Sequence, residues 1–366
     1  MPIVNPVFFS KQYRTTMANW FSFLEARGAT LTASSTPEVT SFGETPAQYP
    51  QLISQTLLFS LDDRGSISCS GQDTDKLLQG QLTCDIRQLS ESRSLKGALC
   101  TVQGRMVSDL QLCRLSTGDT LLVTHRGLVT RTLETLKKFA VFYKTSLDDR
   151  SDDYQLLGLA GPEAKALAQQ LTGQTASDDN CLQGNGLALL RVGPQRWLVI
   201  VPADRAQAVW QQLSAGAIPA GLPLWRLLAI CDGDGEVHPE TTETFIPQML
   251  NLQHTDAINF KKGCYTGQEI VARMQYLGKL KRRMYRLALS GGPAPLPGSP
   301  IHLANGRECG TAVLSAPADQ EQWQLLAVLT EEAAAADVLR FGDDELAVQT
   351  LTLPYDAALN SQQTGN

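Results

Sequence analysis

The residues best suited to chemistry lie in one short segment, residues 261–273, which reads KKGCYTGQEIVAR. Cys264 follows two lysines, of which Lys262 would support a thiolate, and Thr266 and Glu269 have the spacing of a capping box at a helix start. Positive charge and the helix dipole both favour the thiolate, which is the reactive and metal-binding form of cysteine. The segment predicts a reactive thiol, and the alternative is a small buried cysteine in a loop before a helix.

The same segment predicts how such a thiol is presented. Gly263 and Gly267 allow tight turns and the close approach of a ligand to main-chain amides. We expect a helix from the capping box to about Leu277. Glu269 and Arg273 are four residues apart, so they can pair on the surface of that helix and fix the element that presents the thiol.

Composition limits the class of protein. The 366 residues, 43% hydrophobic and 19% charged, are enough for two or three domains with ordinary cores. A formal net charge of −6 argues against a protein held on nucleic acid by bulk charge. No apolar run approaches the roughly 20 residues that cross a bilayer, and the N-terminal residues lack the features of a secretory signal. We therefore expect a cytoplasmic protein with no membrane association.

Metal chemistry has little support in the sequence. The eight cysteines are scattered singly without a C-x-x-C pair, so most should be small buried residues, and no metal site is predicted. The acidic run 232–236 begins like a calcium-binding loop. Val237 stands where that loop needs glycine, however, and Pro239 follows, so calcium binding is not expected. We interpret the run as an acidic turn that leads back into the central domain.

The chain divides into consecutive segments with different patterns. Residues 1–50 are interpreted as an N-terminal extension with a short helix near 19–25 and a Thr/Ser/Pro-rich linker. Residues 51–150 predict a first α+β domain, beginning with a hairpin of 55–61 and 66–70 around the turn at 62–65. The remaining elements of this domain are expected as a helix near 73–81, strands near 97–103, 105–114 and 120–125, and a helix over 127–139.

A second domain is expected over 151–231, with a smaller, ferredoxin-like order of strands and helices. Its predicted elements are a strand at 155–159, a helix at 162–171, a hairpin across 187–201 and a helix at 204–213. Segment 232–283 is expected to pack back onto the first domain, 284–356 to form a small C-terminal β-barrel, and 357–366 to be a polar tail. Strands and helices mix without strict alternation, which favours the α+β class over a doubly wound sheet.

Several segments resemble one known family. The run at 261–273 looks like the signature of the YgfZ proteins, a folate-binding branch related to the T-protein (aminomethyltransferase) of the glycine-cleavage system. The resemblance covers roughly residues 55–355. Its other segments are QGQLTCD at 79–85, LKKFAVF at 136–142, FIPQ at 245–248 with NL at 251–252, and LPY at 353–355.

The resemblance implies three domains in a T-protein-like cloverleaf around a central channel that holds tetrahydrofolate. It also implies a role in iron–sulfur cluster assembly or repair, and through those clusters in tRNA modification. Cys264 would then be the key thiol at the channel mouth. The expected partners are folate and iron–sulfur assembly or client proteins, contact with tRNA would be indirect, and we expect a monomer. The residues expected to form the folate site and its surroundings are Trp225, Tyr265, Gly263, Gly267, Gln268, Glu269, Arg273 and Asp109.

Two positions affect the folate pocket expected from the family. Trp225 matches a family tryptophan that lines the pocket, where its ring could stack on the flat pterin, and the alternative is a core tryptophan. A second pocket tryptophan of the family corresponds to Arg64. An arginine there could stack on the ligand, pair with its glutamate tail or lie in a solvated turn.

The comparison with the T-protein weakens a transferase interpretation. Leu198 occupies the position of the acidic residue with which the T-protein binds folate. Ser108-Asp109 occupies the position of two adjacent acids in the T-protein, so only one of the two is acidic here. A folate-dependent aminomethyl- or methyltransferase nevertheless remains the first alternative, with Asp109 as its proton-handling carboxylate. The second alternative is a tRNA-binding module that uses the basic run 279–286.

Overall fold

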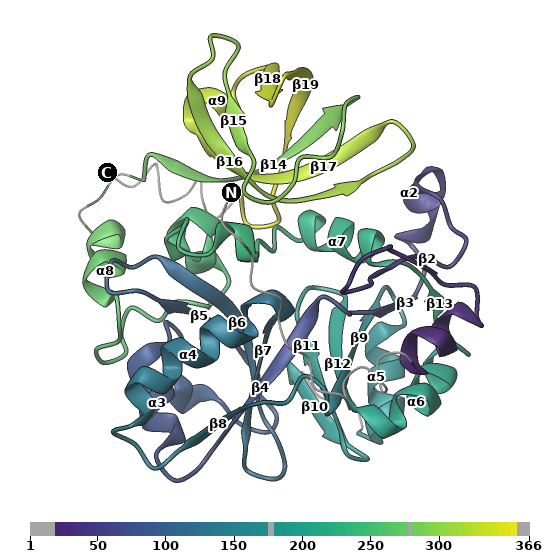
Figure 1. Ribbon diagram of the computed structural model, residues 1–366, viewed down its shortest axis with the longest axis vertical. Coiled ribbons are helices and arrows are strands. Elements are labelled where there is room, and N and C mark those ends of the chain that lie inside the picture. Colours follow the sequence, from purple (N-terminus) through teal and green to yellow (C-terminus); the bar gives the residue numbers. More distant parts are fainter. Residues whose placement is uncertain (1–18, 175–178, 277, 279, 357–366) are drawn as a thin grey trace.

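The computed structural model describes residues 19–174, 179–276, 278 and 280–356. Figure 1 shows three lobes arranged around a centre: a barrel at the top, and two lobes with open sheets below it. Helix α7 (Leu222–Cys231) runs through this centre, beneath the barrel. The predicted α+β class and the T-protein-like cloverleaf with its C-terminal barrel are confirmed.

The first lobe is a five-stranded antiparallel sheet in the order β5-β6-β7-β4-β8. Its helices bury leucines against the sheet, among them Leu77 and Leu78 of α3 and Leu133 and Leu136 of α4. The predicted strands and helices of this lobe are present within a few residues. Their bounds are β4 Arg64–Ser70, α3 Thr74–Gln81, β5 Leu95–Cys100, β6 Met106–Arg114, β7 Thr120–His125, α4 Val129–Ala140 and β8 Ser146–Asp149.

The second lobe is a six-stranded sheet in the order β10-β11-β12-β9-β3-β13. Two helices, α5 and α6, bury alanine, valine and tryptophan side chains in the core of this lobe. The predicted strand, helices and hairpin are again present. The bounds are β3 Leu57–Ser60, β9 Tyr154–Ala160, α5 Ala164–Thr172, β10 Cys181–Gly184, β11 Leu187–Arg191, β12 Arg196–Pro202, α6 Ala206–Leu213 and β13 Ile218–Pro219.

The predicted hairpin at 55–70 is wrong. Strand β3 pairs with β9 and β13 in the second lobe, whereas β4 pairs with β7 and β8 in the first. All four residues of β3 are buried, so both of its faces are covered, and its main chain pairs with β9 on one edge and with β13 on the other. The chain therefore crosses between two sheets at residues 61–63. This crossing brings Asp62, Asp63 and Arg64 to the centre of the molecule.

The N-terminal extension is more structured than a linker. Residues 19–25 are helical as predicted, and strands β1 (Thr30–Leu31) and β2 (Val39–Ser41) form a two-stranded sheet followed by helix α2 (Tyr49–Leu52). The aromatic residues hold it to the second lobe. Trp20 meets Trp210 edge to face with centroids 5.7 Å apart, and Phe42 stacks on the same ring at 5.6 Å.

The C-terminal lobe is a closed barrel in the order β14-β17-β16-β15-β18-β19, as predicted. Its apolar interior includes Leu287, Leu325 and Leu339, and the Ala-rich stretch forms the short helix α9. The bounds are β14 Arg282–Ser290, β15 Pro300–His302, β16 Glu308–Pro317, β17 Gln322–Thr330, α9 Glu331–Ala334, β18 Val338–Phe341 and β19 Asp344–Leu351.

The segment between α7 and the barrel contacts the first lobe. Asn259 donates its main-chain N–H to the Thr83 carbonyl at 2.9 Å, and Met106 donates to the Phe245 carbonyl at 2.8 Å. The segment ends in helix α8 (Gln268–Tyr276), which lies at the outer edge of the first lobe in Figure 1. None of the helices in the described ranges combines the length and the apolar character that a membrane span requires.

Candidate functional site

A cavity lies where the two sheets meet α7. Residues from β4, β5, β6, β12 and α7 line it, together with the acidic segment that follows α7. The cavity has a volume of about 50 Å³ and shares Lys96, Gln111, Val192 and Asp234 with a neighbouring cavity of about 270 Å³. We call the two together the central cavity. Its position matches the centre of the predicted cloverleaf.

Basic side chains from the two sheets meet the acidic segment around this cavity. Arg196, in the apolar strand β12, is buried and donates to Asp232 at 2.5 Å and to Asp234 at 2.8 Å. Lys96 of β5 pairs with the other oxygen of Asp234. Burial alone would lower the pKa of Lys96, but the carboxylates of Asp234 and Asp109 raise it, so the ammonium stays charged. The fold thus gathers buried charges that neutralise one another.

Arg64 is the first residue of β4 and lines the same cavity. It pairs with Glu236 and, at 3.4 Å, with Asp63, and its side chain is 15% exposed, which excludes a solvated turn. Although burial opposes it, the Arg64 and His238 side chains hold the pKa of Glu236 well below its usual range. Glu236 in turn lies 2.9 Å from His238 Nε2. The wall of the cavity is therefore a connected chain of charged and polar groups.

Asp109 projects from β6 into the cavity. Its Oδ1 accepts the Val237 N–H at 2.8 Å, and burial raises the pKa of this carboxyl although Lys96 opposes the shift. The preceding Ser108 is buried, and its hydroxyl accepts from Thr132 at 2.9 Å. Asp109 thus faces the central cavity, whereas Ser108 is bonded within the lobe.

Trp225 of α7 lies both at the cavity and in the core. The residue lines the cavity and is also part of the core, with an exposed fraction of 4%. Its ring packs against Phe59 with centroids 5.3 Å apart, and the Arg196 guanidinium lies 4.9 Å from the ring centroid. Gly158 of β9 makes room for the ring, since an added Cβ would come within 2.8 Å of it. One part of the ring is therefore fixed, while another meets the cavity.

Cys264 lies elsewhere, on the exposed loop before α8. Thr266 anchors this loop to the end of α3, because its N–H donates to the Gly80 carbonyl and its hydroxyl to Gln81 Oε1. Gly267 has φ +83°, and an added Cβ would lie 2.5 Å from the Thr101 carbonyl oxygen. The predicted helix begins next to this glycine, at Gln268. Its predicted end at Leu277 lies outside the described residues.

Lys262 is buried and not free beside the thiol. Its Nζ donates to the main-chain carbonyls of Leu82 at 2.7 Å and Cys84 at 2.6 Å. Burial lowers the pKa of Lys262 to about 8. The same ammonium lies 5.1 Å from the ring centroid of Tyr265, which is also buried. Lys262 and Tyr265 therefore tie the loop to the first lobe.

The structure brings only some of the predicted site residues together. Trp225, Asp109 and Arg64 meet at the central cavity. The others lie on the loop and helix at the outer edge of the first lobe, where Glu269 and Arg273 are exposed on α8. These others are Cys264, Lys262, Tyr265, Gly263, Gly267, Gln268, Glu269 and Arg273.

Several cavity residues could not be assigned from the sequence alone. The acidic run was interpreted as a turn, but Asp232, Asp234 and Glu236 supply the carboxylates of the centre. Three acids within five residues, on a segment that leads into the core, require basic partners there, and that was the available signal. Arg196 in a strand of apolar residues was a second signal, because a buried arginine requires partners. Within the described ranges, no group of three or more histidines, cysteines and acids could hold a metal ion.

Some of the basic side chains in the run 279–286, at the start of the barrel, already contact other side chains of the protein. Arg286 donates to Gln324 at 2.9 Å and to Cys231 Sγ at 3.1 Å, and Arg283 lies over the Tyr285 ring at 4.3 Å. Lys279, in the same run, lies outside the described residues. These contacts leave fewer cations for RNA than the sequence suggested.

The pattern of the GCVT N-terminal domain family matches residues 7–262 of this chain. The crystal structure of glycine cleavage system aminomethyltransferase T from Bartonella henselae has the same fold. It has a TM-score of 0.74 and 17% identity, and the match covers 92% of this chain and 96% of that one.

Curated relatives are nearer in sequence. The tRNA-modifying protein YgfZ of Yersinia enterocolitica is 34% identical over 319 residues, 84% of this chain and 96% of the relative. The protein of the same name from an Enterobacter species is 34% identical over 304 residues, 81% of this chain and 93% of the relative. The chain belongs to the YgfZ family, as its sequence motifs predict.

Proposed function

We propose that this protein binds a tetrahydrofolate in the central cavity and thereby supports the modification of tRNA. The observation that carries the proposal is the meeting of Trp225, Asp109, Arg64 and Lys96 around one cavity in a GCVT-type fold. Relatives that match over most of their length are named tRNA-modifying proteins, which supports the second half of the proposal.

The cavity residues suit a folate chemically. A pterin carries ring-edge donors and acceptors on a flat ring, and the cavity presents donors on Lys96 and Arg64, acceptors on Asp109 and Glu236, and the ring of Trp225. Since the inner cavity is small, the ligand would also occupy its larger neighbour. A bound tetrahydrofolate supplies a one-carbon carrier. The protein side chains would orient it and exclude water.

The cavity wall supports a role as folate binder over T-protein chemistry. Leu198 lines the cavity and is apolar, so it can contribute packing but neither accept nor donate a proton. Asp109 remains a titratable carboxyl, but its Oδ1 is already bonded to the Val237 N–H. We therefore propose that folate acts as a bound carrier or regulator.

The exposed thiol would serve a partner. Cys264 is exposed on a loop that Lys262, Thr266 and Gly267 hold in place, and this exposure supports contact with another protein. We propose that this partner belongs to iron–sulfur cluster assembly or repair. A single thiolate fills one ligand position, so a cluster would need its remaining ligands from that partner.

Folate binding can be tested by calorimetric titration with 5-formyltetrahydrofolate. We expect one site per chain, with affinity at least about tenfold lower in Asp109→Asn and Lys96→Met, because each removes a charge-assisted bond at the ring edge. Cys264→Ala should bind as the natural protein does. Equal affinity in all four proteins would place the folate outside the central cavity, and absence of saturable binding would refute the proposal.

The cellular role can be tested in a strain that lacks the gene. We expect the natural protein to restore the nucleoside modifications of tRNA, measured by mass spectrometry, and Cys264→Ala at equal protein level to fail. Activities of iron–sulfur enzymes measured in the same cells separate the two parts of the proposal. Restored tRNA modification without any change in those activities would exclude the cluster role and leave the tRNA role.

A further inference from the structure

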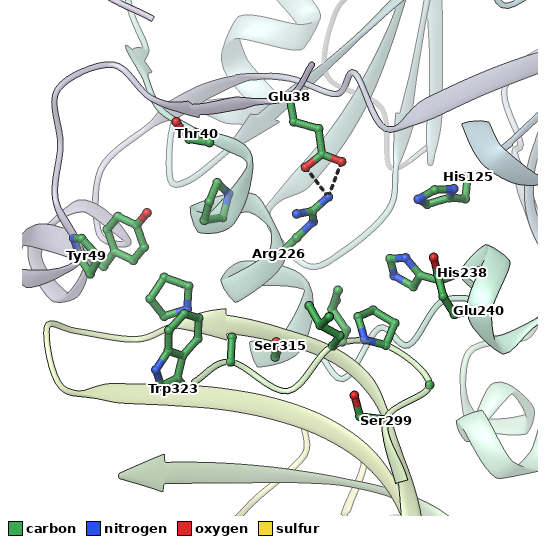
Figure 2. Close-up of a pocket in the computed structure, with 18 of the residues that line it drawn as sticks. Glu38, Thr40, Tyr49, His125, Arg226, His238, Glu240, Ser299, Ser315 and Trp323 are labelled. Carbon is green, nitrogen blue, oxygen red and sulfur yellow. Dashed lines mark hydrogen bonds and ion pairs between the residues drawn. The ribbon is translucent and has the colours of Figure 1, made fainter. Parts of the chain in front are cut away.

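A second and larger cavity lies beside the centre. It has a volume of about 970 Å³, within the size range of small-molecule sites. Its walls come from the N-terminal extension, from α7 and the segment after it, and from the barrel. Figure 2 shows Tyr49 and Trp323 toward one end, and His238 and Glu240 toward the other. We call it the side cavity, and a ligand that uses both of its ends has to be long.

The aromatic end of the side cavity contains a buried hydroxyl that is free to form a hydrogen bond. Tyr49 is 2% exposed, and its hydroxyl has no hydrogen-bond partner among the residues that the structure describes. In Figure 2 this hydroxyl points away from the main chain of α2. A buried polar group without a partner costs free energy, which a ligand that bonds to it would recover. The Trp323 ring at the same end can offer its face to a cation.

A fixed carboxylate lies at this end as well. Glu44 accepts the main-chain N–H of Phe42 at 2.6 Å with one oxygen and that of Gly221 at 2.7 Å with the other. These bonds hold the carboxylate in place and leave each oxygen a further acceptor position. Burial, and after it the nearby charge of Glu44, raises the pKa of Tyr49 to about 12, so the phenol is uncharged at neutral pH. An ammonium here would meet a carboxylate, a phenol oxygen and an aromatic face.

The opposite end also favours a cation. Glu240 is exposed there and has no ion pair with any residue that the structure describes. Glu38 binds Arg226 through both oxygens, at 3.0 and 2.9 Å, and the same guanidinium pairs with Asp63, so two carboxylates already share its charge. Burial lowers the pKa of His125 to about 4, so this ring adds no positive charge at neutral pH. The described part of the lining is therefore net negative.

The rest of the lining includes apolar side chains. Pro223, Leu296, Leu314 and Pro317 all face the side cavity. A ligand charged along its whole length would leave some of its charges beside these groups without partners. Methylene groups could instead pack against them and gain about 25 cal/mol for each Å² of apolar surface removed from water. The lining thus suits a molecule with charged ends and an apolar middle.

We propose that the side cavity binds a linear aliphatic polyamine, a chain of methylene groups with an ammonium at each end. One ammonium would meet Tyr49, Glu44 and the face of Trp323, and the other would meet Glu240. A flexible chain can reach both ends, which a single ring or a metal ion cannot do. The inference goes beyond the proposed folate site and does not depend on it, because the two cavities share no lining residue in the described part of the chain.

The test is isothermal titration of the full chain with spermidine at physiological salt, and butylamine serves as the analogue with one charged end. We expect one saturable site for spermidine and at least about tenfold weaker binding of butylamine, because a monoamine can use only one end of the cavity. Excess magnesium chloride should change the spermidine affinity less than about twofold, since a hydrated metal ion buries no methylene groups. Saturating 5-formyltetrahydrofolate should leave the spermidine affinity unchanged.

One substitution at each end locates the ligand. Tyr49→Phe removes the unpartnered hydroxyl and should weaken spermidine binding about threefold to tenfold. Glu240→Lys reverses the charge at the other end and should weaken it at least about tenfold. The matched control is Glu134→Lys, which makes the same change on the exposed surface of α4 outside the cavity and should alter the affinity less than about twofold. Since Glu240 and Glu134 are both exposed, neither lysine variant should disturb the fold.

The proposal is overturned if spermidine does not saturate, if butylamine binds as tightly, or if magnesium displaces spermidine. Equal losses in Glu240→Lys and Glu134→Lys would also overturn it, because the binding would then be a general attraction to a protein of negative net charge. Unchanged binding in Tyr49→Phe would remove the aromatic end from the site. Competition by 5-formyltetrahydrofolate would place spermidine in the central cavity. Either of these last two results excludes a polyamine that spans the side cavity.

Discussion

The central cavity and the loop that carries Cys264 are built in opposite ways. The cavity collects buried charges from strands and segments far apart in the chain, such as Arg64 and Glu236 or Lys96 and Asp234. The loop is a run of neighbouring residues whose reactive group is exposed and whose support comes from main-chain carbonyls. The difference separates two tasks. A closed interior suits the holding of a small ligand, and an exposed thiol suits contact with another macromolecule.

The largest effect should follow from breaking the charge network. Arg196→Met removes the buried partner of Asp232 and Asp234, and we expect it to lower the free energy of unfolding by about 3–5 kcal/mol, because buried carboxylates lose their counter-charge. Urea unfolding followed by circular dichroism measures this change. The control is Arg307→Ala, which breaks an exposed pair with Glu332 and should cost less than about 0.5 kcal/mol. Equal losses in the two variants would contradict a central role for the buried network.

This contrast also explains what could be predicted from the sequence. The KKGCYTGQEIVAR segment is local, so its loop and the helix start at Gln268 follow from adjacent residues. Apolar periodicity likewise predicted elements such as α4 and β12, since each buries one face or both. A pattern of short strands broken by glycine and proline predicted the C-terminal barrel. The family resemblance then indicated how the three lobes are arranged.

The central cavity was less predictable because its contacts are long-range. Nothing in the sequence near β3 states that its partners are β9 and β13, so a short turn was interpreted as a hairpin. The role of the acids at 232–236 depends on their ion pairs with Lys96 and Arg196. These partners are about 140 and 40 residues away in the chain, so the pairs could not be predicted from the neighbouring sequence. The family resemblance named Trp225 and Asp109 as candidates. It did not point to the other charged residues of the central cavity, which are Lys96, Arg196, Asp234 and Glu236.

The second prediction concerns pH and the crossing between the sheets. Asp62 is buried and accepts the Ser60 hydroxyl at 2.7 Å, and burial raises the pKa of this carboxyl to about 7. A carboxyl whose pKa rises on folding stabilises the protein fully below about pH 4, and that contribution is lost as the pH rises through about 7. Relative to Asp62→Asn, the natural protein should therefore lose up to ~4 kcal/mol of stability between pH 4 and pH 7. Urea unfolding across that range measures the difference.

The variant is the necessary reference because neighbouring groups act in the opposite direction. The pKa of Asp63 is lowered, despite its burial, by Arg64 and Arg226, so its contribution to stability grows as the pH rises. Subtracting the pH profile of Asp62→Asn removes this opposing contribution. Parallel profiles for the two proteins would show that Asp62 titrates normally and that the crossing is solvated.

The third prediction compares two glycines of the loop. Gly267→Ala should destabilise the protein by about 1–3 kcal/mol, because its φ of +83° is strained for alanine and the added Cβ would meet the Thr101 carbonyl oxygen at 2.5 Å. Gly263→Ala is the matched control, since nothing lies within 4 Å of its added Cβ. Thermal unfolding of the two variants measures the difference. If Gly263→Ala were as destabilising as Gly267→Ala, the loop would be held differently from the geometry described.

The smallest effect on stability is expected at the residue with the greatest proposed role. Cys264→Ala should change the free energy of unfolding by less than about 0.5 kcal/mol, because the thiol is exposed. The same substitution should abolish the fast phase of reaction with a thiol-specific disulfide reagent. Six of the eight cysteines are buried, and the half-buried Cys231 is in contact with Arg286 and Gln324. A fast phase that survived in Cys264→Ala and disappeared in Cys231→Ala would move the reactive thiol from the loop to the end of α7, and the separation of tasks between cavity and loop would no longer hold.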